Sequence, residues 1–473
     1  MTKPGYRIDP ADPEAFRRAF HELADVCLDR VEQARDLPWV PKPDDMAETV
    51  ALGTHEQGLG EAEVFAMMRD EVMPYATGNT HPRFFGWVHG TGQPVGVAAE
   101  MVAAAMNSNL GGRDHGAMAV EQAVIDWSRR QAGLPEGASG VLTTGTSQAT
   151  ILALSAARMK LFGDAVRKDG IAGLGRVRVY SVQGAHACIE KAMEVMGHGS
   201  RAVRHIPQGP DGAMDMEELE AAIAEDRAAR ILPMAVVGTA GSVNTGTFDR
   251  LDAIAGLCGR EGLWFHVDGA FGFWAVLAED PWRELVRGVD RADSIAADFH
   301  KWIGVPYDCG MVLMRDGDLH RRTFSTRPAY LEGQGAGLGG GETWFTDYGL
   351  ELSRGFRALK VWAAIKAAGT GALSATISDN CRQAALMAEL VEASEVLELA
   401  QPVQANVCCF YLGRGEASAV ATALQLSGEA VFSTTTLNGR ECLRAAIVNH
   451  RTTEEDIRLA VAAVEREVRS VEV

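Results

Sequence analysis

Short apolar runs alternate with helical patterns through the middle of the chain. The run "GVLTTG" leads into the helical "SQATILALSAARMK", and "RVRVYSV" leads into "HACIEKAMEVMG". Further along, "ILPMAVVGTAG" precedes the helical "FDRLDAIAGLCGREG", and the β-rich runs "LWFHVDGA", "ADSIAADF" and "CGMVLMRD" follow. Strands that alternate with helices and are apolar almost throughout are typical of a mainly parallel sheet covered on both faces. The pattern predicts a large α/β domain over residues 76–380.

The two ends of the chain follow other patterns. Residues 1–75 alternate helical stretches with proline-rich turns such as "LPWVPKPDD", which indicates a helical segment that packs on a second subunit. In residues 381–473, the β-rich "VCCFYLG" and "CLRAAIVN" lie between helices and predict a small C-terminal α+β domain. The glycine-rich run over residues 333–341 predicts a mobile loop.

The composition fits a globular protein and excludes several classes of partner. Of the 473 residues, 47% are hydrophobic and 23% are charged. The 63 acidic and 45 basic residues give a net charge of −18, which disfavours nucleic acid or an anionic membrane as the main partner. We expect no membrane span and no signal peptide, because long apolar stretches are missing and the first residues have no apolar core.

The cysteines predict neither a metal site nor a disulfide framework. None of the eight cysteines is spaced as C-x-x-C, and Cys408 and Cys409 are adjacent. Buried, reduced thiols in a cytoplasmic protein are the expectation that fits this pattern.

Chemically active side chains gather at the ends of the predicted strands. Thr146, His186, Asp268 and Lys301 each lie at or just after such an end, and in open α/β sheets ligands bind beyond the carboxyl ends of the strands. Lys301 is followed by the apolar run "WIGV", where lost hydration disfavours the charged amine and makes it nucleophilic near neutral pH. The alternative is a lysine that reaches out to water.

Asp268 and Lys301 together fit one cofactor. A pyridoxal phosphate site needs a lysine that holds the cofactor aldehyde as a Schiff base. It also needs a carboxylate that keeps the pyridine nitrogen protonated. The alternative for Asp268 is an aspartate that caps a turn. His186 would stack on the cofactor ring, unless it only caps the helix that follows it.

The stretch "TTGTSQAT" predicts a phosphate site at a strand-to-helix junction. Backbone N–H groups and the positive helix end attract an anion there, so Thr146 and Ser147 would hold the cofactor phosphate or, alternatively, only cap the helix. A serine hydrolase is a rival, since Gly145-x-Ser147-x-Ala149 approximates a nucleophile elbow. It would use Ser147 with Asp268 and His300, but it leaves Lys301 without a role.

The set of motifs resembles the pyridoxal-phosphate-dependent group II decarboxylases, which include the aromatic amino acid and glutamate decarboxylases. The likeness covers roughly residues 75–370 through the blocks "HPRFFGW", "EQAVIDW", "GTSQATILALSAAR", "AHACIEKA", "TAGSVNTGTFD", "LWFHVDGAF", "ADSIAADFHKW" and "SRGFRALKVW". The resemblance implies an α/β fold of pyridoxal phosphate fold type I, similar to aspartate aminotransferase. It also implies a homodimer with the active site shared at the subunit interface.

The resemblance also implies roles for single residues. Lys301 would be the Schiff-base lysine, Asp268 the partner of the pyridine nitrogen, and His186 the group stacked on the ring. Tyr330, in "RPAYLE", would protonate the substrate carbon after carbon dioxide leaves. The residues implied to bind the cofactor are Thr146, Ser147, His186, Asp268, Ala270, His300 and Lys301.

Three departures from the family pattern bear on the site. Asp298 replaces the usual asparagine three places before the lysine, and Ser242-Val243 replaces a pair of threonines. The stretch "MNSNLGG" puts Asn107 and Asn109 where a more aromatic substrate wall is usual. The residues predicted to line the substrate pocket are Phe85, Trp87 and Asn109.

These observations predict an enzyme that decarboxylates an L-amino acid to the corresponding amine. Two reactions of the same cofactor stay open, namely oxidative deamination by an aldehyde synthase and retro-aldol cleavage of a carbon–carbon bond. A non-catalytic scaffold is disfavoured because Lys301, Asp268 and His186 are all present. Acidic, aromatic and aliphatic substrates stay open, with a preference for a bulky or aromatic side chain.

Overall fold

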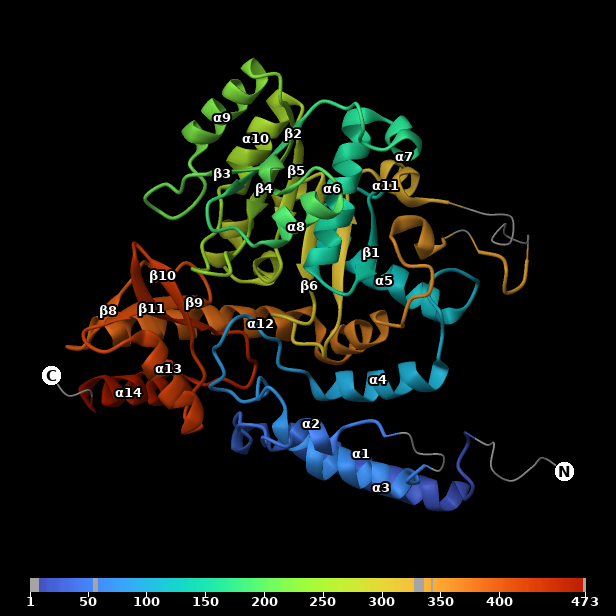
Figure 1. Ribbon diagram of the computed structural model, residues 1–473, viewed down its shortest axis with the longest axis vertical. Coiled ribbons are helices and arrows are strands. Elements are labelled where there is room, and N and C mark those ends of the chain that lie inside the picture. The colour runs from blue at the N-terminus through green and yellow to red at the C-terminus, as the bar shows by residue number, and fades with distance from the viewer. Residues whose placement is uncertain (1–7, 54–57, 327–335, 342, 471–473) are drawn as a thin grey trace.

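A seven-stranded sheet forms the centre of the large domain in the computed structural model, which describes residues 8–53, 58–326, 336–341 and 343–470 (Figure 1). The strand order is β1-β7-β6-β5-β4-β2-β3. All neighbours pair in parallel except β7, which is antiparallel to both β1 and β6. The strands are β1 (Ser139–Thr143), β2 (Val177–Val182), β3 (Val203–Ile206), β4 (Leu232–Thr239), β5 (Trp264–Asp268), β6 (Ser294–Asp298) and β7 (Gly310–Met314).

The prediction of a mainly parallel, doubly covered sheet is confirmed. Every residue of β5, β6 and β7 is buried, which requires packing on both faces of the sheet. Helix α6 crosses β1 and β4 to β7, and its buried residues lie on nearly all of its sides. The helices of this domain are α4 (Pro94–Met106), α5 (Gly116–Gln131), α6 (Thr146–Phe162), α7 (Ala165–Asp169), α8 (Cys188–Val195), α9 (Met216–Ala228), α10 (Leu251–Glu261) and α11 (Gly317–Phe324).

A smaller C-terminal domain contains an antiparallel sheet of order β10-β11-β9-β8. Its core includes the rings of Phe410 and Phe432, which meet edge to face at 6.0 Å. The long helix α12 (Ala358–Glu392) joins the two domains, and its one non-helical residue is Gly369 (φ 75°, ψ 164°). The other elements are β8 (Leu397–Leu399), β9 (Val407–Leu412), α13 (Ala417–Leu426), β10 (Ser433–Leu437), β11 (Arg440–Ala446) and α14 (Glu454–Ser470).

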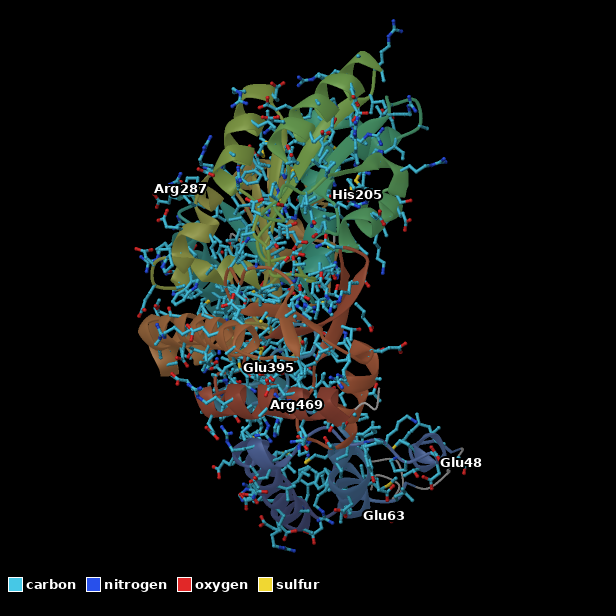
Figure 2. The ribbon with its side chains drawn as sticks, turned by 90° about the vertical axis from the view of Figure 1, so that its left-hand side faces the viewer. Glu48, Glu63, His205, Arg287, Glu395 and Arg469 are labelled. Carbon is cyan, nitrogen blue, oxygen red and sulfur yellow. The ribbon has the colours of Figure 1, made fainter. Side chains whose placement is uncertain are left out.

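The N-terminal helices lie apart from the two sheets. In both views α1 (Pro13–Glu32), α2 (Met46–Thr49) and α3 (Glu61–Met67) extend below the rest of the chain, with Glu48 and Glu63 on this segment (Figures 1 and 2). None of these three helices has a buried residue. Among the described residues, no helix is both long enough and apolar enough to cross a bilayer.

Candidate active site

The carboxyl ends of the neighbouring inner strands β5 and β6 lie side by side in the large sheet. The backbone N–H of Gly269 donates to the Ala296 carbonyl at 2.9 Å, and the N–H of Asp298 donates to the Ala270 carbonyl at 2.9 Å. Asp268 ends β5, Asp298 ends β6, and helix α6 begins nearby at Thr146. The structure thus brings together residues from three segments that the sequence separates widely.

Lys301 lies within contact of Asp298. Its Nζ is 3.1 Å from Asp298 Oδ2, and the lysine side chain keeps 24% of its surface exposed while the aspartate keeps 3%. Asp298 Oδ1 accepts the backbone N–H of Thr146 at 2.8 Å. The buried Asp298 carboxylate therefore joins Lys301 to the first turn of α6. The aspartate that replaces the family asparagine thus has the Thr146 N–H and the Lys301 ammonium as its partners.

The start of α6 has unused hydrogen-bonding capacity that fits a phosphate. The buried Thr146 hydroxyl has no partner among the described residues, whereas Ser147 is exposed. A Cβ at Gly145 would lie 3.7 Å from both Asp298 Oδ1 and His300 Cε1, so this corner is closely packed but not blocked. A helix N-terminus with a free hydroxyl matches the donor set that binds anions.

His300 closes the other side of this corner. Its Nδ1 accepts the backbone N–H of Cys309 at 3.0 Å, and its Nε2 lies 3.6 Å from Asp298 Oδ2. Burial lowers the pKa of His300, although the Asp298 carboxylate acts in the opposite direction. The ring is therefore a neutral group at the phosphate end of the site. No described hydrogen bond links it to Ser147, so the hydrolase triad is not assembled.

Asp268 is buried with only weak partners in the described part of the chain. Its Oδ1 accepts the Ala270 N–H at 3.4 Å, and Cys188 Sγ is 3.8 Å from its Oδ2. Burial raises the pKa of Asp268, and the charges of His186 and Lys301 oppose this rise. A carboxyl in this setting gains from a nearby protonated ring nitrogen, so the donor set fits the pyridine of pyridoxal phosphate.

His186 stands on the turn between β2 and α8. Its Nδ1 accepts the backbone N–H of Cys188 at 3.2 Å, and its side chain is exposed. This bond fixes the ring direction and leaves Nε2 to carry the proton when the imidazole is neutral. Cys188 links the two groups, because its N–H donates to His186 and its Sγ lies 3.8 Å from Asp268 Oδ2.

One polar residue at the site and one at the boundary between the domains escaped the sequence reasoning. Thr239 ends β4 in register with Asp268, and its buried hydroxyl has no described partner. Thr239 could have been identified from the sequence in the same way as Asp268, because it also lies at the end of a predicted strand. Arg444 on β11 is 2% exposed, and its Nε and Nη2 have no partner in the described ranges. Burial lowers the pKa of Arg444 to about 10, and nothing in the local sequence of the small domain indicated this setting.

Trp87 lies at the boundary between the domains and leaves 51% of its side chain exposed. Its backbone has φ 51°, which is uncommon for a residue with a side chain. The small domain holds this conformation, because Ser433 Oγ accepts the Trp87 N–H at 3.2 Å and Arg444 donates to the Trp87 carbonyl at 2.8 Å.

The other predicted substrate residues are placed differently. Phe85 is 1% exposed and packs on Phe432 in the core of the small domain, so the prediction that it lines the pocket is wrong. The side-chain oxygen of Asn109 accepts the backbone N–H groups of Gly111 and Arg354 at 2.9 and 3.0 Å. Asn109 therefore stabilises the local turn of the backbone. Tyr330 lies outside the described residues.

Comparison with known proteins agrees with this donor set. A family model described as the pyridoxal-dependent decarboxylase conserved domain matches residues 43–413. An aromatic-L-amino-acid decarboxylase of Bacillus atrophaeus is 29% identical over 96% of both chains. A phenylacetaldehyde synthase of Arabidopsis thaliana is 25% identical over 98% of both chains. A crystal structure of Oryza sativa TDC with PLP and tryptamine superposes with a TM-score of 0.88 at 26% identity, covering 98% of this chain and 99% of the other.

Proposed function

Because the chain belongs to the family of pyridoxal-dependent decarboxylases, we propose that it converts an L-amino acid to the corresponding amine and carbon dioxide. The enzyme is a carboxy-lyase whose cofactor is pyridoxal phosphate. The observation that carries the proposal is that the buried Asp268 carboxyl ends β5, while the partly exposed Lys301 follows the end of the adjacent strand β6. This arrangement supports a reaction in which the protonated pyridine ring of the cofactor accepts the electrons of the bond between the substrate Cα and its carboxylate.

Each residue of the site has a defined task in this proposal. Bound pyridoxal phosphate supplies the electron sink that makes loss of carbon dioxide feasible. The Lys301 amine would hold the cofactor through its aldehyde. Asp268 would keep the proton on the pyridine nitrogen, and the Thr146 hydroxyl, which has no partner among the described residues, would donate to the phosphate. The remaining residues around the cofactor would be Ser147, His186, Ala270 and His300.

Water exclusion and proton delivery complete the proposed reaction. His186 would lie over the ring face and keep water from the carbon that loses carbon dioxide. Tyr330 would then give that carbon its proton. A loop that carries an acid to the site is a common way to finish such a reaction in a closed pocket.

Lys301→Ala tests the central claim. We expect the visible absorbance of lysine-bound cofactor to disappear together with carbon dioxide release from the twenty amino acids. Lys160→Ala is the matched control, because Lys160 lies on α6 with its Nζ 3.3 Å from Asp293 Oδ1. Visible absorbance that persists in Lys301→Ala as it does in the control would refute the assignment.

An aldehyde synthase is the second candidate, and the likeness to the phenylacetaldehyde synthase keeps it open. We expect Tyr330→Phe to divert the product from amine toward aldehyde, ammonia and hydrogen peroxide, since the substrate carbon would lose its proton donor. Measuring carbon dioxide, aldehyde and peroxide together separates the two reactions and also detects retro-aldol cleavage, which releases an aldehyde without carbon dioxide. Unaltered amine output from the variant would remove Tyr330 from this role.

We also propose a homodimer with a shared active site, built around the N-terminal helices. Helices α1 and α3 pack on each other through Phe16 and Phe65 at 5.7 Å, yet neither contains a buried residue. Large apolar side chains of residues 8–53 and 58–75 face outward, namely Ile8, Phe20, Leu28, Val40, Val50, Leu52, Leu59, Val64, Met68 and Val72. An exposed apolar surface of this size is typical of a subunit interface. Light scattering of the wild type should give twice the chain mass, and Leu28→Glu with Val64→Glu should lower it.

The cytoplasm is the proposed compartment. All eight cysteines are free thiols, and seven of them are buried. Reduced thiols fit a compartment kept reducing by glutathione and thioredoxin. Fractionation of the cells that make the protein would test this, and recovery outside the cytoplasm would contradict it.

A further inference from the structure

Four rings line the boundary between the two domains, and we call Phe84, Trp87, His89 and Tyr307 the aromatic wall. His89 stacks on Phe84 with ring centroids 5.7 Å apart and on Trp87 at 5.5 Å. The Tyr307 ring meets His89 edge to face at 6.3 Å. Trp87 and Tyr307 are 51% and 50% exposed, so the two ends of the wall present open ring surface on either side of the histidine.

The wall is attached directly to the segment that carries Lys301. A Cβ at Gly90 would lie 1.5 Å from the His300 carbonyl oxygen and 3.2 Å from that of Lys301, so the chain after His89 packs on these two backbones. The Tyr307 hydroxyl accepts the Gly90 N–H at 3.3 Å. The Tyr307 ring also lies 4.4 Å from the His300 ring. These contacts place the backbone that follows His89 directly against the backbone of His300 and Lys301.

His89 has hydrogen-bonding groups that no described residue uses. Neither ring nitrogen makes a hydrogen bond within the described ranges, and the residue is only partly buried. Burial lowers the pKa of His89, and the Lys301 charge lowers it further. The imidazole is therefore neutral near pH 7 and offers one donor and one acceptor, without the charge that would attract an acidic side chain.

We propose that His89 is a specificity-determining residue that hydrogen-bonds a polar group on an aromatic substrate side chain held against Trp87 and Tyr307. The inference rests on the proposed decarboxylase function and names its substrate class, aromatic amino acids that carry a ring hydroxyl or a ring N–H. Exposed ring faces supply a stacking surface that favours an aromatic side chain. The imidazole supplies the discrimination, because a site with a hydrogen-bonding group disfavours a substrate that leaves it unpaired.

The test compares tyrosine with phenylalanine as substrates of the holoenzyme. His89→Phe keeps a stacked ring and removes the hydrogen bond, so the tyrosine-to-phenylalanine ratio of kcat/KM should fall about tenfold, the size expected for one neutral hydrogen bond. The loss should appear in KM and should be larger for tyrosine than for phenylalanine. His89→Gln, which keeps a donor and an acceptor, should restore most of the ratio. His205→Phe is the matched control, since His205 lies on the large domain and pairs with Glu190 at 2.9 Å (Figure 2).

A binding measurement separates recognition from turnover. Tyramine and 2-phenylethylamine can be titrated into each variant while the visible band of the bound cofactor is followed. We expect His89→Phe to weaken tyramine binding about tenfold more than it weakens 2-phenylethylamine binding.

The outcomes distinguish this inference from the function on which it rests. An unchanged tyrosine-to-phenylalanine ratio in His89→Phe would overturn the role of His89. Faster carbon dioxide release from acidic or aliphatic amino acids than from aromatic ones would overturn the substrate class while leaving the decarboxylase intact. Failure of every amino acid to release carbon dioxide from a cofactor-loaded enzyme would instead refute the proposed function.

Discussion

The buried ion pair between Glu121 and Arg354 gives a sharp prediction, because it supports the strand that leads into the phosphate site. Glu121 on α5 is 0% exposed at its side chain and Arg354 is 2% exposed, with Nη2 and Oε1 2.5 Å apart. Arg354 also donates to the carbonyls of Leu110 and Leu142 at 3.0 and 2.7 Å. Glu121 accepts the N–H of Leu142 on β1 at 3.2 Å.

Removing one member of this pair leaves the other charge buried. Arg354→Met should lower the free energy of unfolding by about 3–5 kcal/mol, the usual cost of an uncompensated buried charge. The double variant Glu121→Leu with Arg354→Met should recover at least about 1 kcal/mol of this, because apolar side chains of similar volume replace the stranded carboxylate. The recovery is partial, since Leu110 and Leu142 still lose buried hydrogen bonds.

Urea unfolding followed by tryptophan fluorescence measures these differences in matched samples. Cofactor affinity provides a second readout, because Leu142 lies one residue before the end of β1 and Thr146 comes three residues after that end. Arg354→Lys is the control, as it keeps the charge and loses the planar fork. A double variant that is no more stable than Arg354→Met would refute the reasoning that the stranded charge dominates.

Three further predictions concern the cofactor site and the buried histidines. Thr146→Val should raise the dissociation constant for pyridoxal phosphate about 10- to 100-fold in an absorbance titration, because a hydrogen bond to a charged group is lost; the exposed Ser147→Ala should change it less, and an equal effect of both would contradict the assignment. Asp298→Ala should weaken cofactor binding about tenfold more than Asp298→Asn, which still accepts the Thr146 N–H; equal affinities would show that this bond does not order the site. Burial lowers the pKa of His266 to about 4, so it stays neutral when folded, and as pH falls from about 6.5 to about 4 the unfolded chain gains a proton that the folded one does not. The free energy of unfolding, and with it the melting temperature, should therefore fall over this range. His266→Leu should reduce the fall in unfolding free energy by up to about 3 kcal/mol. Parallel plots of unfolding free energy against pH for the wild type and the variant would refute this.

The sequence predicted the fold well where the apolar pattern decides the outcome. Runs such as "WFHVD" and "SIAAD" are buried throughout, as their composition indicated. The apolar pattern could not predict that β7 runs antiparallel to its neighbours, because a buried strand has the same composition in either direction. The predicted boundary at residue 380 falls within α12, since a helical pattern continues through the place where the domain changes.

The site was predicted as far as strand ends reveal it. Asp268, Lys301 and Thr146 follow from the rule that ligands bind beyond the carboxyl ends of parallel strands. Phe85 was misplaced because two adjacent phenylalanines look alike in sequence, while pairing with Val431 turns its ring into the small domain. His89 was missed because only the folded chain brings it against the backbone of His300.

The segment that carries the aromatic wall is divided between the two domains. Phe85 and Trp87 are hydrogen-bonded to Val431 and Ser433 of the small domain. Gly90 is bonded to Tyr307 of the large domain. A change in the angle between the domains, which α12 accommodates most easily at its kink, would shift Trp87 relative to His89. The distance between the Trp87 and Tyr307 rings is thus set by the relative position of the two domains.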